Sequence, residues 1–353
     1  MVGTSLVGCQ DPLCLSPTNQ FMPSCRWAKV FVFDRFLLLN FSDSRLLMLR
    51  IKQANPMHSV QDLGRYGFAS QGVAKAGPMD SVAACWANSC LGNAVTLPLL
   101  EIGGGGFVAE FTKDVNLALT GAWGEMTLDG QPLPGPGAHP VSAGSVLRLG
   151  RFSSGMFSYL AVQGGFAIQP VLGSVSTCQR DSLGGLDGQG EPLSIEDTLP
   201  YQTAERRPVN LIPRRYLESY HQPLVCDVIL RETDQFASDA TDLFFNQGYK
   251  VTREQSRMGY RLDGDLSIVA ERPRYSVPIP LGGIQVPPSG QPIVLMRDHQ
   301  SLGGYPMLGT LTRKSLGQLA QRRAGQMVSF RAVSREIAVQ EFLQYRQFFG
   351  DFR

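Results

Sequence analysis

The sequence predicts a mainly β chain that forms two tandem β-barrel domains with a few short helices. The chain of 353 residues contains 38 Gly and 23 Pro. These residues interrupt its apolar runs at short intervals, which favours many short strands over long helices. Hydrophobic residues make up 43% and charged residues 18% of the sequence, as expected for a globular protein with a sizeable core. Many short strands with one or two helices in each half are typical of small barrels.

The elements of the first half follow from the spacing of apolar and turn residues. In residues 79–91 the apolar positions recur at helical spacing, and Gly92-Asn93 ends the run, so this half contains one amphipathic helix. Glycine or turn residues bound the three clearest strands, which we expect at 117–120, 146–149 and 158–162.

The second half alternates strands and turns between two helices. We expect a strand at 225–230, a short helix at 237–246, strands and turns over 251–330, and a closing helix at 336–348.

Three regions are expected along the chain. Residues 1–47 hold an apolar run that Asp34 and Arg35 interrupt, too short and too charged to span a bilayer, and they lack a signal-peptide pattern. We expect this region to be a non-native or disordered extension before a natural start at Met48. A first barrel is predicted at 48–205 and a second barrel with a C-terminal helix at 216–353, joined by a polar stretch around 203–215.

Composition and missing motifs exclude several classes of function. A formal net charge of +2 gives no reason to expect nucleic acid or an anionic membrane as a partner. The cysteines Cys85, Cys90, Cys178 and Cys226 have no metal or redox spacing and suggest buried thiols in the cytoplasm. The four histidines are scattered, so no metal site is expected. The chain has no P-loop, no G-x-S-x-G elbow and no H-E-x-x-H helix.

Residues 59–65 place an amide, a carboxylate and a guanidinium around a glycine. Gln61 and Asp62 lie on opposite faces of a predicted strand, and Gly64 lets the backbone turn before Arg65. The guanidinium of Arg65 could bind a carboxylate or phosphate. A structural interpretation, in which Asp62 and Arg65 staple a turn, competes with the catalytic one.

Asp80 stands directly before the helix predicted in the first half. A carboxylate there complements the positive end of the helix, and the free N–H groups of the same end could instead receive an anion. Both interpretations remain open.

A third block of polar residues interrupts the strands of the second half. Amides and carboxylates on glycine- and proline-broken strands contribute little to a core, because each buried polar group needs a partner. We therefore predict a polar pocket lined by Gln285, Gln291, Asp298, Gln300 and Tyr305.

At these residues the chain resembles the KipA-like family, also described as allophanate hydrolase subunit 2, biotin-dependent carboxyltransferase or the C subunit of 5-oxoprolinase. The resemblance covers residues 48–330. The motifs that carry it are V-Q-D-x-G-R at 60–65, G-x-M-D at 77–80, A-L-T-G-A at 118–122, Y-L-A-V-x-G-G-F at 159–166, G-S-x-S-T at 173–177, R-M-G-Y-R-L at 257–262 and I-Q-V-P-P-x-G-Q-P-I-V-L-M at 284–296. Leu281 and Leu302 depart from the family pattern beside two of these runs.

The resemblance implies cyclophilin-like barrels and a role within an enzyme complex. The expected function is that of the C subunit of an ATP-dependent 5-oxoprolinase, which opens 5-oxo-L-proline to L-glutamate with a KipI-like B subunit and a LamB/YcsF-like A subunit. ATP enters as a co-substrate with Mg²⁺, and no tightly bound cofactor is expected. Phosphorylation of the lactam oxygen would create a leaving group and requires cations and an oriented acceptor.

Site roles follow from the same resemblance. Asp62, Arg257 and Asp298 are the expected catalytic residues, with Arg65 and Arg257 as anion binders. Asp62 or Asp298 would orient Mg²⁺ or the nucleophile. The expected substrate-binding residues are Gln61, Arg65, Asp80, Tyr260, Gln285, Gln291, Gln300 and Tyr305.

Two other functions fit the same family. One is a carboxyltransferase that moves CO₂ from carboxybiotin to urea or a similar amide, although the chain has no biotinylation motif. The other is a KipA-like regulator that binds a KipI-like kinase inhibitor. Gene neighbourhood would separate the three.

Overall fold

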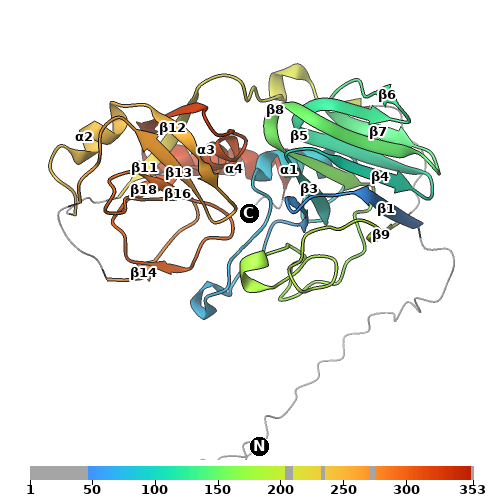
Figure 1. The fold of residues 1–353 in the computed structure, drawn as a ribbon, viewed down its shortest axis with the longest axis horizontal. Coiled ribbons are helices and arrows are strands. Elements are labelled where there is room, and N and C mark those ends of the chain that lie inside the picture. The colour runs from blue at the N-terminus through green and yellow to red at the C-terminus, as the bar shows by residue number, and fades with distance from the viewer. Residues whose placement is uncertain (1–46, 203–209, 232–234, 271–274, 351–353) are drawn as a thin grey trace, which may run out of the picture. The chain divides into compact units, whose positions relative to one another are not determined.

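The protein is mainly β, as its turn-rich sequence predicts. The computed structural model describes residues 47–202, 210–231, 235–270 and 275–350 (Figure 1). Apart from Leu47, the residues predicted to form an N-terminal extension lie outside this description. Strands and turns dominate both halves, with few helices.

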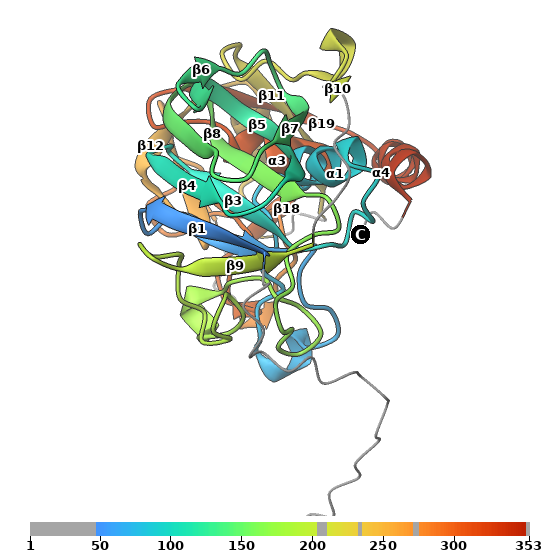
Figure 2. The ribbon, with the colours of Figure 1, turned by 90° about the vertical axis from the view of Figure 1, so that its right-hand side faces the viewer.

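Ten strands of the first half form one antiparallel sheet. Its main path runs β10-β7-β5-β8-β4-β1-β9, while β3 pairs with β2 and β8, and β6 pairs with β5. Figure 2 shows β1, β4, β5 and β8 side by side. The strands are β1 (Leu47–Gln53), β2 (His58–Gln61), β3 (Leu99–Gly103), β4 (Phe107–Phe111), β5 (Val115–Leu128), β6 (Gln131–Pro132), β7 (Gly137–Val141), β8 (Val146–Val162), β9 (Thr198–Tyr201) and β10 (Asn210–Leu211).

Two strands that the sequence predicted separately form a single strand in this sheet. Residues 146–149 and 158–162 both belong to β8, which continues for 17 residues. Its pairing with β5 shifts register between Gly121 and Met126, and Gly155 adopts a φ of 79°. Bulges and a left-handed glycine let a strand bend without ending, so the glycines that suggested turns instead curve the strand.

Seven strands of the second half close into a barrel. Their order is β11-β18-β15-β16-β13-β12-β19, and the parallel pairing of β11 with β19 closes the ring. The strands are β11 (Leu224–Leu230), β12 (Tyr249–Gln255), β13 (Gly259–Gly264), β15 (Gly283–Gln285), β16 (Ile293–Leu295), β18 (Met307–Leu311) and β19 (Met327–Ala332). A separate two-stranded ribbon pairs β14 (Val277–Pro278) with β17 (Leu302–Gly303).

Three of the α-helices agree with the sequence prediction, and one does not. The confirmed helices are α1 (Ser81–Cys90), α2 (Ala240–Phe245) and α4 (Arg335–Phe349). The fourth, α3 (Arg313–Ala320), lies where only strands and turns were expected. Thr312 caps it by accepting a hydrogen bond from the Ser315 N–H. Short 3₁₀ turns occur at η1 (Ala69–Gln71), η2 (Gln179–Asp181) and η3 (Arg214–Tyr216).

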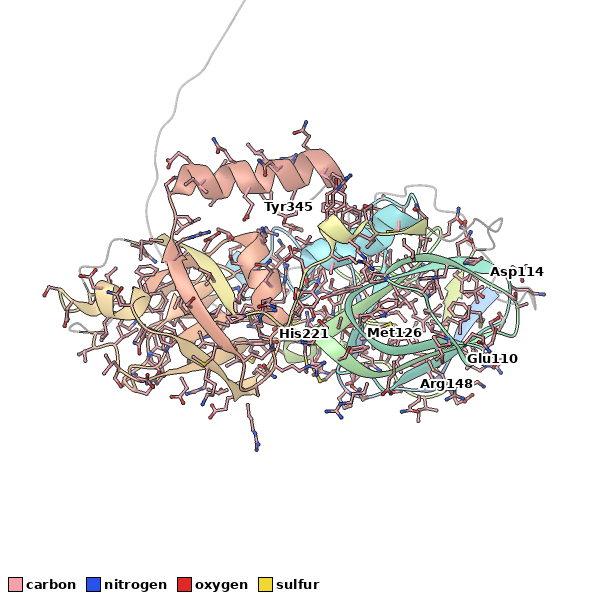
Figure 3. The ribbon with its side chains drawn as sticks, turned by 90° about the horizontal axis from the view of Figure 1, so that it is seen from above. Glu110, Asp114, Met126, Arg148, His221 and Tyr345 are labelled. Carbon is pink, nitrogen blue, oxygen red and sulfur yellow. The ribbon has the colours of Figure 1, made fainter. Side chains whose placement is uncertain are left out.

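The C-terminal helix α4 packs on α1 through aromatic side chains. Trp86 of α1 meets Phe348 and Phe349 with ring centroids 5.1 and 5.5 Å apart. Tyr345 belongs to the same cluster, and Figure 3 shows it on the inward side of α4. This contact keeps α4 beside the first turns of α1.

The described cysteines are free thiols, as expected. Cys85, Cys178 and Cys226 are buried and Cys90 is half-buried. Burial raises the pKa of Cys90 to about 11, so this thiol stays protonated near neutral pH.

His58 of β2 is buried in the neutral form. Its Nδ1 accepts from the Asn55 N–H at 3.2 Å, and its Nε2 faces the Gly105 carbonyl at 3.2 Å. An N–H can only donate and a carbonyl can only accept, so the proton sits on Nε2. Burial lowers the pKa of His58 to about 4.

Within the described residues, every helix is too short or too polar to cross a membrane.

Candidate functional site

Arg257 is the centre of a buried ionic cluster that joins the two halves of the structure. It lies in the turn between β12 and β13. Its Nε and Nη2 donate to the two carboxylate oxygens of Asp298 at 2.7 and 3.0 Å. Nη1 donates to Glu101 of β3, and Nη2 also donates to the Gly77 carbonyl at 2.7 Å. The side chain of Arg257 keeps 22% of its surface exposed and that of Asp298 6%, so the cluster reaches solvent at this pair.

Glu101 holds the first half of the structure to this cluster. Its second oxygen, Oε2, accepts from the Met79 N–H at 2.6 Å and from the Tyr159 hydroxyl at 2.9 Å. Burial raises the pKa of Glu101, and Arg257 opposes that shift. Burial by itself would lower the pKa of Arg257, but Asp298 and Glu101 raise it above its ordinary value. The guanidinium therefore stays charged, and its positive charge compensates the buried carboxylates of Glu101 and Asp298.

Asp80 extends the cluster toward α1. Its backbone N–H donates to the Tyr159 hydroxyl at 2.7 Å, which links it to Glu101. Its carboxylate caps α1 through the Ala83 N–H at 3.1 Å and accepts from Gln321 Nε2 at 3.0 Å. Burial raises the pKa of Asp80. The cap agrees with the structural interpretation of Asp80, and the anion-binding interpretation stays a prediction.

The loop that carries Asp298 lies close to a segment of the first half. The Asp298 N–H donates to the Arg257 carbonyl at 2.8 Å, which fixes the loop. Burial, followed by the charge of Asp298, raises the pKa of Cys178 to about 12. Burial lowers the pKa of His299, and the nearby charge of Arg180 adds to this effect. Residues 178–180 therefore lie close enough to residues 298–299 for their charges to interact.

Asp62 and Arg65 form a second polar group, about the loop at 171–176. Asp62 Oδ1 accepts from the hydroxyls of Ser174 and Ser176 at 2.5 and 2.6 Å, and Oδ2 accepts from the Val175 N–H at 2.9 Å. Arg65 donates from Nη2 to the Ser176 carbonyl at 2.6 Å and from Nε to the Val171 carbonyl at 3.2 Å. Each residue thus ties its turn to this loop, in place of the Asp62–Arg65 pair of the structural interpretation, and the catalytic role of Asp62 stays a prediction.

The remaining predicted residues are dispersed. Gln61 is buried and donates to Ser59 at 2.9 Å. Tyr260 donates to the Ala320 carbonyl at 3.0 Å. The Gln291 side-chain oxygen accepts from the Gly264 N–H at 2.8 Å, and its Nε2 donates to the Gly264 carbonyl at 3.1 Å.

Three predicted pocket residues differ in exposure. Gln285 is buried, Gln300 is half-buried and Tyr305 is exposed. Of the predicted residues, only Arg257 and Asp298 meet directly, and Asp80 joins them through Tyr159 and Glu101. The contacts that join Arg257, Asp298 and Asp80 thus draw on both halves of the structure, and the pocket expected from the third polar block stays a prediction.

Glu101 and Tyr159 are site residues that the sequence analysis did not select. Glu101 is the one charge inside the apolar strand β3, and a carboxylate in an otherwise buried run is a usable signal. Tyr159 stands in the Y-L-A-V-x-G-G-F motif. Arg297, beside Asp298, is 2% exposed, and its Nε and Nη2 have no hydrogen-bond partner among the described residues.

The two arginines assigned to phosphate binding donate hydrogen bonds to other groups of the chain. All three guanidinium nitrogens of Arg257 donate to protein acceptors, and Arg65 donates to backbone carbonyls. Within the described ranges no group of three His, Cys, Asp or Glu could hold a metal ion. The buried Nη1 of Arg65 has no hydrogen-bond partner among the described residues, and phosphate binding by these two arginines stays a prediction.

Comparison with known proteins places these features in a family. The family described as "Carboxyltransferase domain, subdomain A and B" matches residues 71–332. The 5-oxoprolinase C subunit of Haemophilus influenzae is 35% identical over 292 residues, which cover 81% of this chain and 92% of that protein. The protein of the same name from Escherichia coli is 35% identical over 309 residues, covering 86% of this chain and 96% of that protein.

A solved structure shares the fold. The urea amidolyase of K. lactis superposes with a TM-score of 0.80 at 25% identity and covers 88% of this chain. This chain spans only 20% of that larger protein. The family match and the two relatives confirm the resemblance found in the sequence motifs: the chain belongs to the carboxyltransferase subdomain A and B family, which includes proteins named as the C subunit of 5-oxoprolinase.

Proposed function

We propose that this chain is the C subunit of an ATP-dependent 5-oxoprolinase that converts 5-oxo-L-proline to L-glutamate. The observation that carries the proposal is its match to two proteins of that name over 92% and 96% of their lengths. A KipI-like B subunit and a LamB/YcsF-like A subunit complete the enzyme in this proposal.

The chemistry of the ionic cluster supports recognition of an amide. One guanidinium stands between two carboxylates, so the cluster favours a hydrogen-bond donor over a further anion. A lactam presents its ring N–H as such a donor. Asp298, at the end of the cluster that faces residues 178–180, is the acceptor that we assign to the substrate. Glu101 acts through Arg257 and is a positioning residue.

The hydrogen bonds that Arg65 and Arg257 donate within the chain bear on where ATP binds. Because each guanidinium nitrogen of Arg257 donates within the chain and Arg65 Nε and Nη2 donate to backbone carbonyls, we propose that partner subunits supply the main phosphate contacts. This chain then orients the lactam while the phosphoryl group is transferred to its oxygen. Orientation of that kind lowers the barrier by holding the reacting atoms in line.

Substitution of Asp298 in the three-subunit enzyme tests the proposal. Asp298→Asn keeps the size of the side chain and removes its charge, and we expect the ATP-dependent release of glutamate from 5-oxoproline to fall about 100-fold or more. Asp227→Asn is the matched control, because Asp227 forms an exposed pair with Arg331 and should leave the rate unchanged. Full activity of Asp298→Asn in a folded complex would exclude this assignment.

A carboxyltransferase function is the second candidate, and the family match and the urea amidolyase fold favour it. It requires carboxybiotin on a separate carrier. Avidin would then block turnover, whereas glutamate release by a 5-oxoprolinase should be insensitive to avidin.

A further inference from the structure

A pocket of about 640 Å³ has Asp80 in its wall but none of the other residues of the ionic cluster. It is lined by α1, by the bend of β5, by residues 212–220, and by α3 and α4. The proposed 5-oxoprolinase chemistry leaves this pocket without a role. Its volume is that of a site for a small organic molecule.

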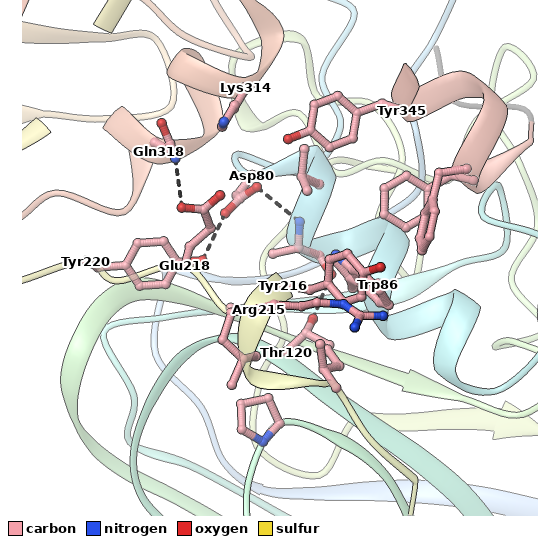
Figure 4. A pocket seen from close by; sticks show the side chains of 18 of the residues that line it. Asp80, Trp86, Thr120, Arg215, Tyr216, Glu218, Tyr220, Lys314, Gln318 and Tyr345 are labelled. Atoms are coloured by element: carbon pink, nitrogen blue, oxygen red, sulfur yellow. Dashed lines mark hydrogen bonds between the residues drawn. The ribbon is translucent and has the colours of Figure 1, made fainter. Parts of the chain in front are cut away.

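One end of the pocket is polar and acidic. Figure 4 shows Asp80, Glu218, Gln318 and Lys314 close together at this end. Asp80 is only 4% exposed, and its carboxylate has neutral partners: the Ala83 N–H, Gln321 and, at 3.4 Å, the Tyr220 hydroxyl. A buried carboxylate without a bonded cation is costly.

The acidic groups of the pocket influence one another. Burial and the charge of Glu218 raise the pKa of Asp80, while hydrogen bonds from Ala83 and Gln321 and the charge of Arg297 lower it. Burial also raises the pKa of Tyr345, and Glu341, Glu218 and Asp80 add to that shift. These three carboxylates therefore act on the same space.

The lining holds fewer basic residues than carboxyl groups. Lys314 and Arg215 are the two cations among the lining residues. The guanidinium of Arg215 lies over the Tyr216 ring, 4.8 Å from its centroid, and is occupied by that contact. A cationic ligand would meet the three carboxyl groups Asp80, Glu218 and Glu341 in the lining, against two cationic side chains.

The opposite end of the pocket is aromatic. The ring of Trp86 lies 5.3 Å from that of Tyr216 and 5.1 Å from that of Phe348. Figure 4 shows Trp86 and Tyr216 side by side, below Asp80 in this view. Aromatic faces stabilise both an apolar body and an adjacent cation.

We propose that this pocket binds a small organic ammonium compound whose charged group meets Asp80 and Glu218 and whose apolar body lies against Trp86 and Phe348. The inference does not depend on the proposed reaction. The pocket shares Asp80 with the ionic cluster, since the Asp80 N–H bonds Tyr159 and Tyr159 bonds Glu101. A bound ligand would therefore contact the network that holds Arg257.

Titration of the purified full-length chain with benzylamine tests the proposal. Trp86 and Trp123 both line the pocket, so tryptophan fluorescence reports occupancy, and calorimetry gives the affinity. Benzyl alcohol and benzoate serve as neutral and anionic probes of similar size. We expect saturable binding of benzylamine, with benzyl alcohol weaker and benzoate weakest.

Charge variants supply the sharper test, because their effects have opposite signs. Glu218→Gln should weaken benzylamine binding about threefold or more, and Lys314→Gln should tighten it by a similar factor. Glu254→Gln is the control, since Glu254 pairs with Arg261 away from the pocket. The proposal is overturned if benzylamine does not bind, if benzoate binds as tightly, or if both pocket variants leave its affinity unchanged. None of these outcomes bears on glutamate release by the assembled enzyme.

Discussion

Removal of the cation from the ionic cluster should cause a large loss of stability. Arg257→Met keeps a long side chain but leaves two carboxylates without their cation: the side chain of Glu101 is 1% exposed and that of Asp298 is 6% exposed. Removing one partner of a buried ion pair costs about 3–5 kcal/mol. We therefore expect the free energy of unfolding at pH 7 to fall by about 3–5 kcal/mol, measured by urea unfolding and linear extrapolation.

The loss should also depend on pH, in a direction set by the unpaired carboxylates. Without Arg257, burial raises the pKa of Glu101 further above its unfolded value, so the folded variant binds more protons than the unfolded chain. Its stability then rises, relative to the parent protein, as the pH falls from 7 toward 5. Adding Glu101→Gln to Arg257→Met should recover part of the loss at pH 7, because the amide oxygen can still accept from Tyr159.

An exposed ion pair provides the control for this experiment. The side chain of Arg331 is 65% exposed in its pair with Asp227, so Arg331→Met should cost less than about 1 kcal/mol. If Arg257→Met costs no more than this control, the cluster does not carry the stability that its burial implies, and the reasoning fails.

Further predictions concern three residues of the first half. His58 has a folded pKa of about 4 and an unfolded pKa of about 6.5, so protonation of the unfolded chain should lower the free energy of unfolding by about 3 kcal/mol as the pH drops from above 6.5 to 4. Urea unfolding of a His58→Gln variant should lack this pH dependence. Gly64→Ala should destabilise the fold by more than about 1 kcal/mol, since φ is 94° and the new Cβ would lie 2.6 Å from the Lys75 carbonyl oxygen; an unchanged Tm would contradict this. Asp62→Ala should cost about 2–3 kcal/mol by freeing Ser174 and Ser176, while the folded complex retains kcat; a kcat loss at unchanged stability would instead make Asp62 catalytic.

Local features of the structure could be predicted because their causes are local. The apolar spacing and the Asp80 cap determine α1, and turn residues bound the strand β11 and the helices α2 and α4. The helix α3 was not predicted, because it has only eight residues and its start depends on the hydrogen bond from the Ser315 N–H to the Thr312 side chain, which only the structure shows.

Composition, spacing and motifs were enough to establish the mainly β class, the family and the kinds of residues available to the site. Which of these residues meet depends on the folded chain. Glu101 lies 156 positions from Arg257, and Asp62 lies 112 positions from Ser174. Alternation along a strand specifies the face on which a side chain lies, but it carries no information about which distant strand or loop packs against that face. For that reason Arg257 and Asp62 were recognised as important polar residues, while the buried carboxylate that pairs with one and the loop that the other anchors emerged only from the three-dimensional packing.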